Sequence, residues 1–218
     1  MKALGRSPRL TAFVYLAIAV PAASGAADAP LLGDASRGAA LTAACQACHG
    51  AHGEGNPAGG FPRLAGQTAD YLAAQMRNFA DGRRSSPVMA PVAKGLDAQQ
   101  AADAAAFYAV QSAPYAAGST HPTPVQLRRG RLLTRVGDES KQLQACANCH
   151  GPDGSGERYA APYLAGQSAT YLASAIREWK SGTRHSGEKQ MGPVVARLDD
   201  QDIAALGAYF ESLGEASR

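Results

Sequence analysis

Two short stretches contain all four cysteines of this 218-residue chain, "CQACHG" at 45–50 and "CANCHG" at 146–151. Two cysteines three positions apart, with histidine directly after them, have the spacing that attaches a c-type haem. The thiols add to the two vinyl groups at one edge of the porphyrin, and the neighbouring imidazole is then placed under the iron. The predicted ligand sets are Cys45, Cys48 and His49 for one haem c and Cys146, Cys149 and His150 for a second.

Other uses of paired cysteines fit this sequence less well. A thioredoxin-type redox motif belongs near a βαβ pattern, which the sequence lacks. The two cysteine pairs of a structural zinc site usually lie ~15–20 residues apart, whereas these pairs begin 101 residues apart. Disulfides are compatible with an exported protein, but they give no reason for a histidine after each pair. Haem attachment is therefore the favoured interpretation.

The motif occurs twice because a whole unit is repeated. "FPRLAGQTADYLAAQMRNFADGRRSS" (61–86) aligns with "APYLAGQSATYLASAIREWKSGTRHS" (161–186) at an offset of 100. Between the copies, the segment 112–124 is rich in proline and small polar residues, which is typical of a linker. The sequence therefore predicts two tandem domains, at 28–118 and 119–218.

Each copy has the pattern of an all-α unit. Apolar residues recur at helical spacing, and no alternation of apolar and polar residues predicts a strand. Short helices joined by Gly/Pro loops, with only 6% aromatic residues, would make a thin core, which a large flat ligand in each unit would fill. The predicted helix starts follow Asp34, Thr68 and Asp97 in the first copy and Ser168 and Asp199 in the second, with one near Pro124, and the middle helices are expected to stop at Gly82 and Gly182.

Two of the four methionines recur at matching positions, Met89 in "MAPV" and Met191 in "MGPV", 40 and 41 residues after the ligand histidines. Met76, by contrast, aligns with Ile176 and is expected to be core. A core-filling methionine would not be expected to recur in a Pro-flanked loop, so Met89 and Met191 are the predicted second axial ligands. His185 could compete with Met191, although an ordinary loop role is favoured. A His/Met pair raises the reduction potential and leaves no vacant site, which favours electron transfer.

Residues 1–27 have the pattern of an export signal. A basic start is followed by an apolar run at 10–20 and by small residues suited to cleavage between Gly25 and Ala27. The competing interpretation is a membrane anchor. Eleven helical residues rise only ~16 Å, however, against a hydrocarbon core of ~30 Å. The predicted location is therefore the periplasm.

Removal of this segment changes the charge balance. Without Lys2, Arg6 and Arg9 the chain has 18 Lys and Arg against 18 Asp and Glu, so the mature chain is formally neutral. The densest basic cluster, "RRGR" (128–131), is interpreted as a solvated helix face. Nothing in this distribution indicates a nucleic-acid partner.

The motif series "CQACHG…FPRLAGQ…MAPV" and "CANCHG…APYLAGQ…MGPV" resembles the two-haem cytochrome c4 family, and the resemblance extends from about Gly33 to Leu213. It implies an all-α fold of two tandem class I cytochrome c domains, each wrapped around one covalently bound haem c. It also implies pseudo-symmetric packing, with the haems close enough to exchange electrons. Members of that family are periplasmic electron carriers.

The resemblance implies further roles at matching positions. Pro62 and Pro162 correspond to the proline whose carbonyl accepts the imidazole N–H. Arg84 and Arg184 are candidates to pair with haem propionates, although surface solubility is an equal alternative for them. The second copy departs from the first by nine extra residues before its cysteine motif and two extra before its methionine.

The expected function is that of a soluble dihaem electron carrier, not an enzyme. Its donor would be a cytochrome bc-type membrane complex or a dehydrogenase, and its acceptor a terminal oxidase or reductase. Peripheral membrane contact is compatible with this role, as is either a monomer or a homodimer. The alternative is the electron-accepting subunit of a flavoprotein sulfide dehydrogenase or a quinoprotein alcohol dehydrogenase. A haem peroxidase would need an open iron, which two repeated methionines argue against.

Overall fold

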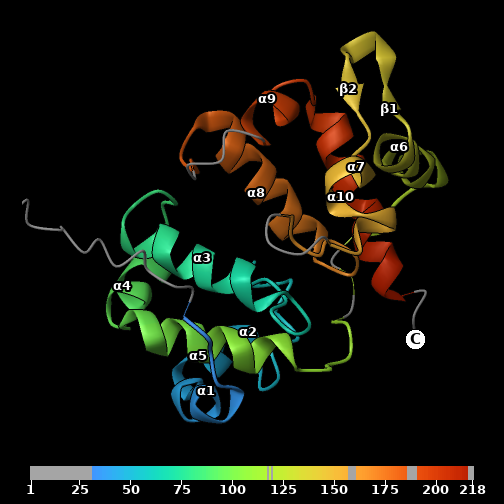
Figure 1. Ribbon diagram of the computed structural model, residues 1–218. Helices are drawn as coiled ribbons and strands as arrows, with labels where there is room; N and C mark the ends of the chain where they lie inside the picture. Colours follow the sequence, from blue (N-terminus) through green and yellow to red (C-terminus); the bar gives the residue numbers. More distant parts are fainter. Residues whose placement is uncertain (1–30, 117, 119, 157–160, 186–190, 216–218) are drawn as a thin grey trace, which may run out of the picture. The chain divides into compact units, whose positions relative to one another are not determined.

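The computed structural model describes residues 31–116, 118, 120–156, 161–185 and 191–215. The predicted export signal lies outside these residues. The described chain is predominantly helical and forms two groups of helices that follow one another in sequence (Figure 1). The prediction of an all-α fold is therefore confirmed, apart from one small hairpin.

The two halves contain the same series of helices. The first half consists of α1 (Ala35–Leu41), α2 (Ala43–His49), α3 (Ala69–Ala80), α4 (Met89–Lys94) and α5 (Ala98–Ala109). The second half consists of α6 (Pro124–Arg135), α7 (Ala147–His150), α8 (Ala169–Ser181), α9 (Met191–Val195) and α10 (Asp200–Glu215), with the strands β1 (Gly137–Asp138) and β2 (Leu143–Gln144) and short 3-10 turns at Glu139–Lys141 and Pro152–Gly154.

The helices begin where the sequence places their caps. The side chain of Asp34 accepts hydrogen bonds at the start of α1, and Thr68 and Ser168 do so at α3 and α8. At the other end, α8 stops at Gly182 as predicted, and this C-cap glycine is left-handed. Helix α3 ends at Ala80, two residues before the predicted Gly82, because Asp81 already forms the C-cap.

A glycine fixes the crossing of the first and last helices in each half. Helix α1 packs on α5, and α6 packs on α10. A Cβ added to Gly38 would lie 2.1 Å from the carbonyl oxygen of Asp103, and one added to Gly130 would lie 2.2 Å from that of Ala205. Asp103 and Ala205 occupy equivalent positions in the repeat. The same close crossing is therefore built twice, but the cysteine motif follows it directly only in the first half, because β1 and β2 lie between α6 and Cys146 in the second.

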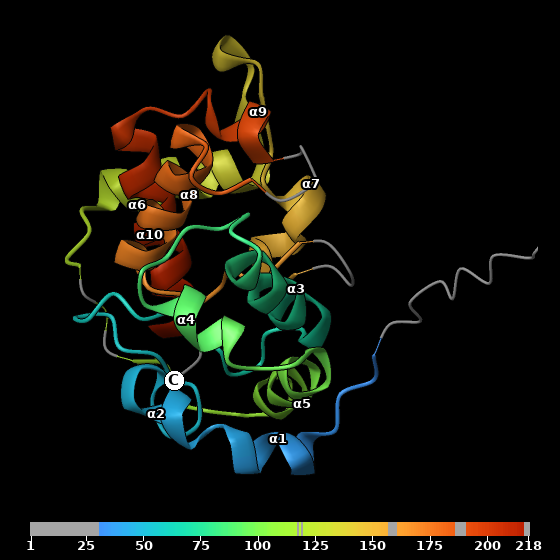
Figure 2. The ribbon, with the colours of Figure 1, turned by 90° about the vertical axis from the view of Figure 1, so that its left-hand side faces the viewer.

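The hairpin is the element that the sequence pattern did not predict. Strands β1 and β2 pair antiparallel through Gly137–Gln144 and Asp138–Leu143, and the hairpin projects from the second half in both ribbon views (Figures 1 and 2). It lies in the segment between Gly130 and Cys146, which is nine residues longer than its counterpart in the first copy. Two-residue strands are too short to show a period of two, which explains why the pattern missed them.

The predicted linker connects the halves, but it also packs against them. Ala113 is buried, and Arg63 donates hydrogen bonds to the carbonyl oxygens of Ala113 and Pro114 at 2.6 and 2.8 Å. The Arg63 guanidinium also lies 4.3 Å from the centre of the Tyr115 ring. These contacts hold the connection to the first half instead of leaving it as a free spacer.

The protein core of each half is small, as the composition predicts. The second half buries a cluster that includes Leu133, Val195 and Ile203, whereas the first buries chiefly Leu72, Ala105 and Tyr108. No helix within the described residues is long and apolar enough to span a membrane. The space that these thin cores leave lies beside the cysteine motifs.

Candidate haem sites

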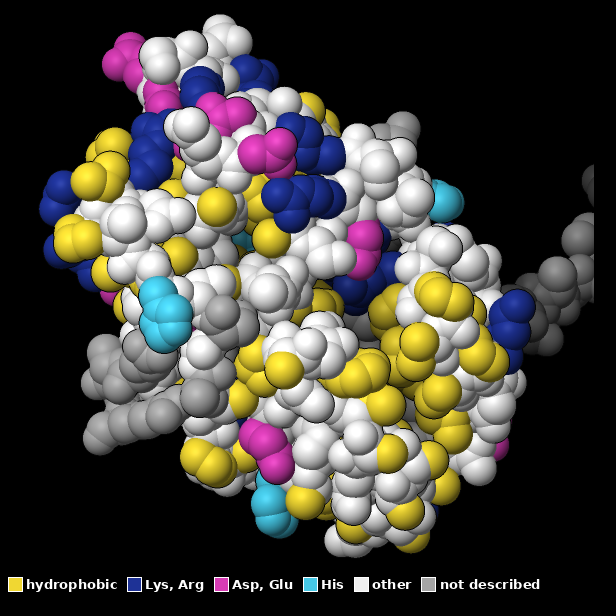
Figure 3. Space-filling view, turned by 180° about the vertical axis from the view of Figure 1, so that it is seen from behind, with side chains coloured by type: hydrophobic (Ala, Val, Ile, Leu, Met, Phe, Trp, Pro, Cys, Tyr) yellow, Lys and Arg dark blue, Asp and Glu magenta, His cyan; other side chains and the backbone are white. Residues whose placement is uncertain are grey.

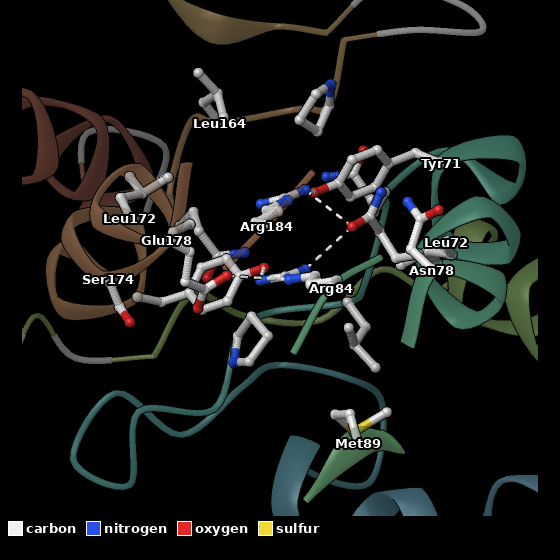
Figure 4. A pocket seen from close by; sticks show the side chains of 18 of the residues that line it. Tyr71, Leu72, Asn78, Arg84, Met89, Leu164, Leu172, Ser174, Glu178 and Arg184 are labelled. Carbon is white, nitrogen blue, oxygen red and sulfur yellow. Dashed lines mark hydrogen bonds and ion pairs between the residues drawn. The ribbon is translucent and has the colours of Figure 1, made fainter. Parts of the chain in front are cut away.

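All the predicted haem-binding residues line one large cavity. Its volume is about 1310 Å³, which exceeds the ~300–1,000 Å³ of a pocket for one small molecule. Residues of both halves line it, and Figure 4 shows part of its wall. The predicted residues that line it are Cys45, Cys48, His49, Pro62, Arg84 and Met89 from the first half and Cys146, Cys149, His150, Pro162, Arg184 and Met191 from the second.

The two motif histidines are held in the same way. His49 and His150 are both buried, and their Nδ1 atoms lie 2.9 and 3.1 Å from the carbonyl oxygens of Pro62 and Pro162. A carbonyl only accepts, so each Nδ1 carries the proton and donates it. Each Nε2 is then left with its lone pair, which is the form that binds a metal.

Electrostatics favours the same neutral form of these imidazoles. Burial lowers the pKa of His49 and of His150, and the proline carbonyls offset this only in part. Since a histidine must be neutral to coordinate iron, burial and the carbonyl bond together preorganise both rings.

A glycine after each histidine allows the chain to leave the helix at the cavity. Helix α2 is capped by Gly50 with φ of 84°, and α7 is capped by Gly151 with φ of 73°. This left-handed backbone favours glycine. The turn carries the chain away from the ring, so that the imidazole can face the cavity.

The four cysteines form no disulfide, and burial works against a thiolate at the first cysteine of each pair. All four are free. Burial raises the pKa of the Cys45 thiol and raises that of Cys146 to about 11. A thioredoxin-type site would require a lowered thiol pKa, so this finding disfavours that alternative.

The two methionines occupy matching places in the fold. Met89 is the first residue of α4 and Met191 the first residue of α9, so the predicted loops are short helices. Both residues line the cavity that contains the histidines. His185 is exposed, and its Nδ1 lies 3.0 Å from the carbonyl oxygen of Gly182.

The two arginines are buried between the halves, so the alternative that they merely aid solubility is wrong. Arg84 is 4% exposed and Arg184 is 6% exposed. Their backbones form an isolated antiparallel bridge, and the backbone N–H of His185 donates to the carbonyl of Arg83 at 2.8 Å. Figure 4 shows both guanidinium groups pointing into the space between α3 and α8.

Four side chains that the sequence analysis missed bind these arginines. Arg84 donates to Glu178, Gln75 and Tyr171 at 3.2, 3.2 and 3.1 Å. Arg184 donates to Tyr71 and to Gln75, both at 2.9 Å. Burial alone would raise the pKa of Tyr71, but the two guanidiniums lower it. Because Gln75 and Glu178 are not repeated in the other copy, the repeat gave no signal for them.

The sequence analysis also missed Gln67 and Gln167, the last residues of the repeated "LAGQ". The Gln67 side chain exchanges two hydrogen bonds with the backbone of Tyr163, both 3.0 Å. The Gln167 side chain does the same with the backbone of Arg63, again at 3.0 Å. A polar residue repeated without a haem role is the signal that could have identified this symmetric contact.

Comparison with known proteins accounts for both halves. A family model for cytochrome c matches residues 35–109 and again 138–214. The chain is 42% identical to a thiosulfate dehydrogenase electron acceptor of Thiomonas intermedia over 77% of each chain. It is 40% identical to a cytochrome c4 of Pseudomonas aeruginosa over 83% of this chain and 89% of the relative.

A solved structure shows the same arrangement. Reduced recombinant cytochrome c4 from Pseudomonas stutzeri superposes with a TM-score of 0.75 at 32% identity, covering 83% of this chain and 99% of that one. The predicted fold of two tandem cytochrome c domains is thereby confirmed, and with it the prediction of haem c as the cofactor of each.

Proposed function

This chain belongs to the cytochrome c4 family, and from that premise we propose that it carries electrons between redox proteins of the periplasm, one haem c in each domain. Each half contains its own cysteine pair, a buried histidine with Nδ1 bonded to a proline carbonyl, and a methionine that begins a helix. The pairing of these two complete sets around one cavity is the observation that supports the proposal.

The chain's own residues hold the redox centres and move little. Haem, when bound, supplies a one-electron couple. Cys45 and Cys48, or Cys146 and Cys149, would fix its edge, while the proline carbonyl keeps the histidine ring in one orientation. Met89 and Met191 would complete the coordination and raise the reduction potential. With a histidine and a methionine on each iron no position would be left open for a substrate, so we propose that the protein is not itself an enzyme.

The donor that we favour is a dehydrogenase that oxidises thiosulfate. The relative at 42% identity, and another at 36%, are named as electron acceptors of thiosulfate dehydrogenase. The electrons would pass on to a terminal oxidase or reductase. A cytochrome bc-type complex remains the alternative donor, because other relatives are named simply as cytochrome c4.

The first test is reduction by the favoured donor. The purified oxidised holoprotein would be mixed with thiosulfate and a purified thiosulfate dehydrogenase, and haem absorbance followed. Rapid reduction of both haems is expected, and thiosulfate without the enzyme is the control. Because the mature chain is formally neutral, the rate should depend weakly on ionic strength. A rate no faster than the control would exclude this donor.

The second candidate is a permanent subunit of such a dehydrogenase, with which the names of the same relatives are equally compatible. A gentle periplasmic extract run on a sizing column distinguishes the two. Haem absorbance that elutes at the size of the mature chain or its dimer supports the mobile carrier. Haem that co-elutes with a catalytic polypeptide supports the subunit.

A further inference from the structure

Each motif histidine is connected by hydrogen bonds to a glutamine of the opposite half. The carbonyl of Pro62 accepts the bond from Nδ1 of His49 at 2.9 Å. In the same peptide group, the N–H of Arg63 donates to Oε1 of Gln167 at 3.0 Å. One planar peptide group therefore lies between the predicted haem ligand of the first half and a side chain of the second.

The second half repeats this arrangement with the roles of the halves exchanged. The carbonyl of Pro162 lies 3.1 Å from Nδ1 of His150, and the N–H of Tyr163 donates to Oε1 of Gln67 at 3.0 Å. The residue after the proline is arginine in one copy and tyrosine in the other, but only its backbone takes part in these bonds. The arrangement is therefore the same in both copies although the two side chains differ.

The orientation of each glutamine amide is fixed by its other hydrogen bonds. Gln67 and Gln167 are each 6% exposed. Each Oε1 also accepts the N–H of the following residue, which is the N-cap of α3 or α8, at 3.1 and 3.0 Å. Each Nε2 donates to the carbonyl of the same residue whose N–H the oxygen accepts, at 3.0 Å. A reversed amide would point its NH₂ group at two N–H donors, so the oxygen must face the peptide.

A hydrogen bond at one end of a peptide group strengthens the bond at its other end. Donation by the N–H polarises the peptide, so its carbonyl becomes a better acceptor, by roughly 10–30% per bond in such a chain. A better acceptor for the Nδ1 proton raises the basicity of the imidazole toward a metal. A more basic axial ligand stabilises ferric haem, and this lowers the reduction potential.

A contact that only joined the halves would not need to fall on this one peptide in both copies. We infer that Gln167 is a positioning residue for the haem of the first half and Gln67 for that of the second, each lowering the reduction potential in the half opposite to its own. The inference rests on the proposed function in one respect, because each half must hold a haem that its own histidine ligates. It assigns these glutamines a part in the redox sites that the sequence analysis did not predict.

The test is a redox titration of the holoprotein followed by NMR, in which signals from each half report the oxidation state of its own haem. Gln167→Leu removes the acceptor of the Arg63 N–H, so the midpoint potential of the first haem should rise while that of the second stays unchanged. Gln67→Leu should raise the second potential and leave the first unchanged. In the reduced protein, the Nδ1–H resonance of the affected histidine should also move upfield, because its hydrogen bond is weaker.

Each variant is the matched control for the other, because both remove the same two hydrogen bonds across the same contact. A purely structural role would loosen the contact and shift both potentials alike in either variant. Equal shifts of both potentials, a shift only in the half that contains the substitution, or no shift in either variant would each overturn the inference.

A second pair of variants avoids dependence on the folding of the leucine variants. Gln67→Asn and Gln167→Asn keep an amide at the contact but shorten the side chain by one methylene, which withdraws its oxygen from the peptide N–H. The same crossed shifts are expected, with a smaller fall in the thermal unfolding midpoint, and their absence would overturn the inference. The potentials are measured without a redox partner. A wild type that shows two reversible couples but takes no electrons from a donor would therefore contradict the proposed function alone.

Discussion

The two halves of the molecule are alike where they surround the haem positions and differ at part of the contact between them. Both bond the histidine to a proline carbonyl, both cross their terminal helices at a glycine, and both begin a short helix with methionine. At the contact between the halves, however, Gln75 aligns with Ala175 and Asn78 aligns with Glu178. Each half must supply a complete set of haem ligands of its own. At the contact between the halves, one polar member of an aligned pair of residues is enough to make the hydrogen bond.

The surfaces differ as well. Between 28 and 118 the chain has 6 Lys and Arg and 7 Asp and Glu, while 119–218 has 12 and 11. Viewed from behind, the dark blue side chains accordingly gather on the second half, and the first half presents mainly apolar and uncharged ones (Figure 3). Each half is close to neutral, so the difference lies in charge density and not in sign.

The largest effect is expected from the methionines. Met89→Ala or Met191→Ala should open the sixth position of one haem, so that the reduced protein binds one carbon monoxide per chain and one midpoint potential falls. The wild type should bind it slowly or not at all. The measurement is optical titration with carbon monoxide. If either variant resembles the wild type, the ligand in that half is a different residue.

The next effect tests the repeated helix crossing. Gly38→Ala and Gly130→Ala each place a Cβ close to a backbone carbonyl oxygen, so each should destabilise the fold by about 3 kcal/mol, near the upper end of overpacking costs. Thermal unfolding followed by circular dichroism measures this. Gly192→Ala is the control, because a Cβ there meets no atom within 4 Å and the first copy has alanine at that position. Equal stability of all three variants would show that the crossings can relax.

A smaller effect is expected from the ion pair between Arg37 and Asp103, which lies at the crossing of α1 and α5 and has no counterpart at Ala205 in the second half. The Arg37 guanidinium, with the Asp34 N–H and Gln99, holds the pKa of Asp103 well below its usual range. A lowered pKa in the folded state gives stability above the ordinary carboxyl pKa, and that stability is lost as pH falls through the lowered value.

Asp103→Asn should therefore lower the unfolding midpoint at pH 7 and weaken its fall on acidification. Thermal melts between about pH 7 and pH 2 measure both effects, a range that spans the usual carboxyl pKa. Asp200→Asn, whose side chain is 84% exposed, should change neither. An acid dependence in Asp103→Asn as steep as that of the wild type would contradict this assignment.

The smallest effect exchanges two aligned aromatic residues. The hydroxyl of Tyr108 is buried beside the Cys45 thiol and the Thr42 side chain without a hydrogen bond of good geometry among the described residues, and the aligned residue is Phe210. Tyr108→Phe should therefore be neutral or stabilising by up to about 1 kcal/mol, whereas Phe210→Tyr should destabilise by about 1–3 kcal/mol. Chemical denaturation measures both. A clear loss of stability in Tyr108→Phe would mean that the hydroxyl has a partner in the holoprotein.

The local features could be predicted from the sequence because they depend on neighbours along the chain. Helix caps at Asp34 and Thr68, the left-handed Gly182 and the spacing of the haem motif each involve residues a few positions apart. The repeat then doubled every such feature. The strands β1 and β2 were harder to predict, because the inserted segment that contains them has no counterpart in the first copy with which to compare its sequence.

By itself, the sequence determined the chemistry: two CxxCH motifs, two methionines and an all-α repeat define which residue types are available and how often. Only the tertiary structure decided which of them meet. Arg84 and Glu178 lie 94 residues apart, and Tyr71 and Arg184 lie 113 apart, so no local pattern could pair them. The physical reason is that the contact between two packed halves depends on how their surfaces fit together. A buried charged side chain there can bond only to the groups that this fit brings close to it.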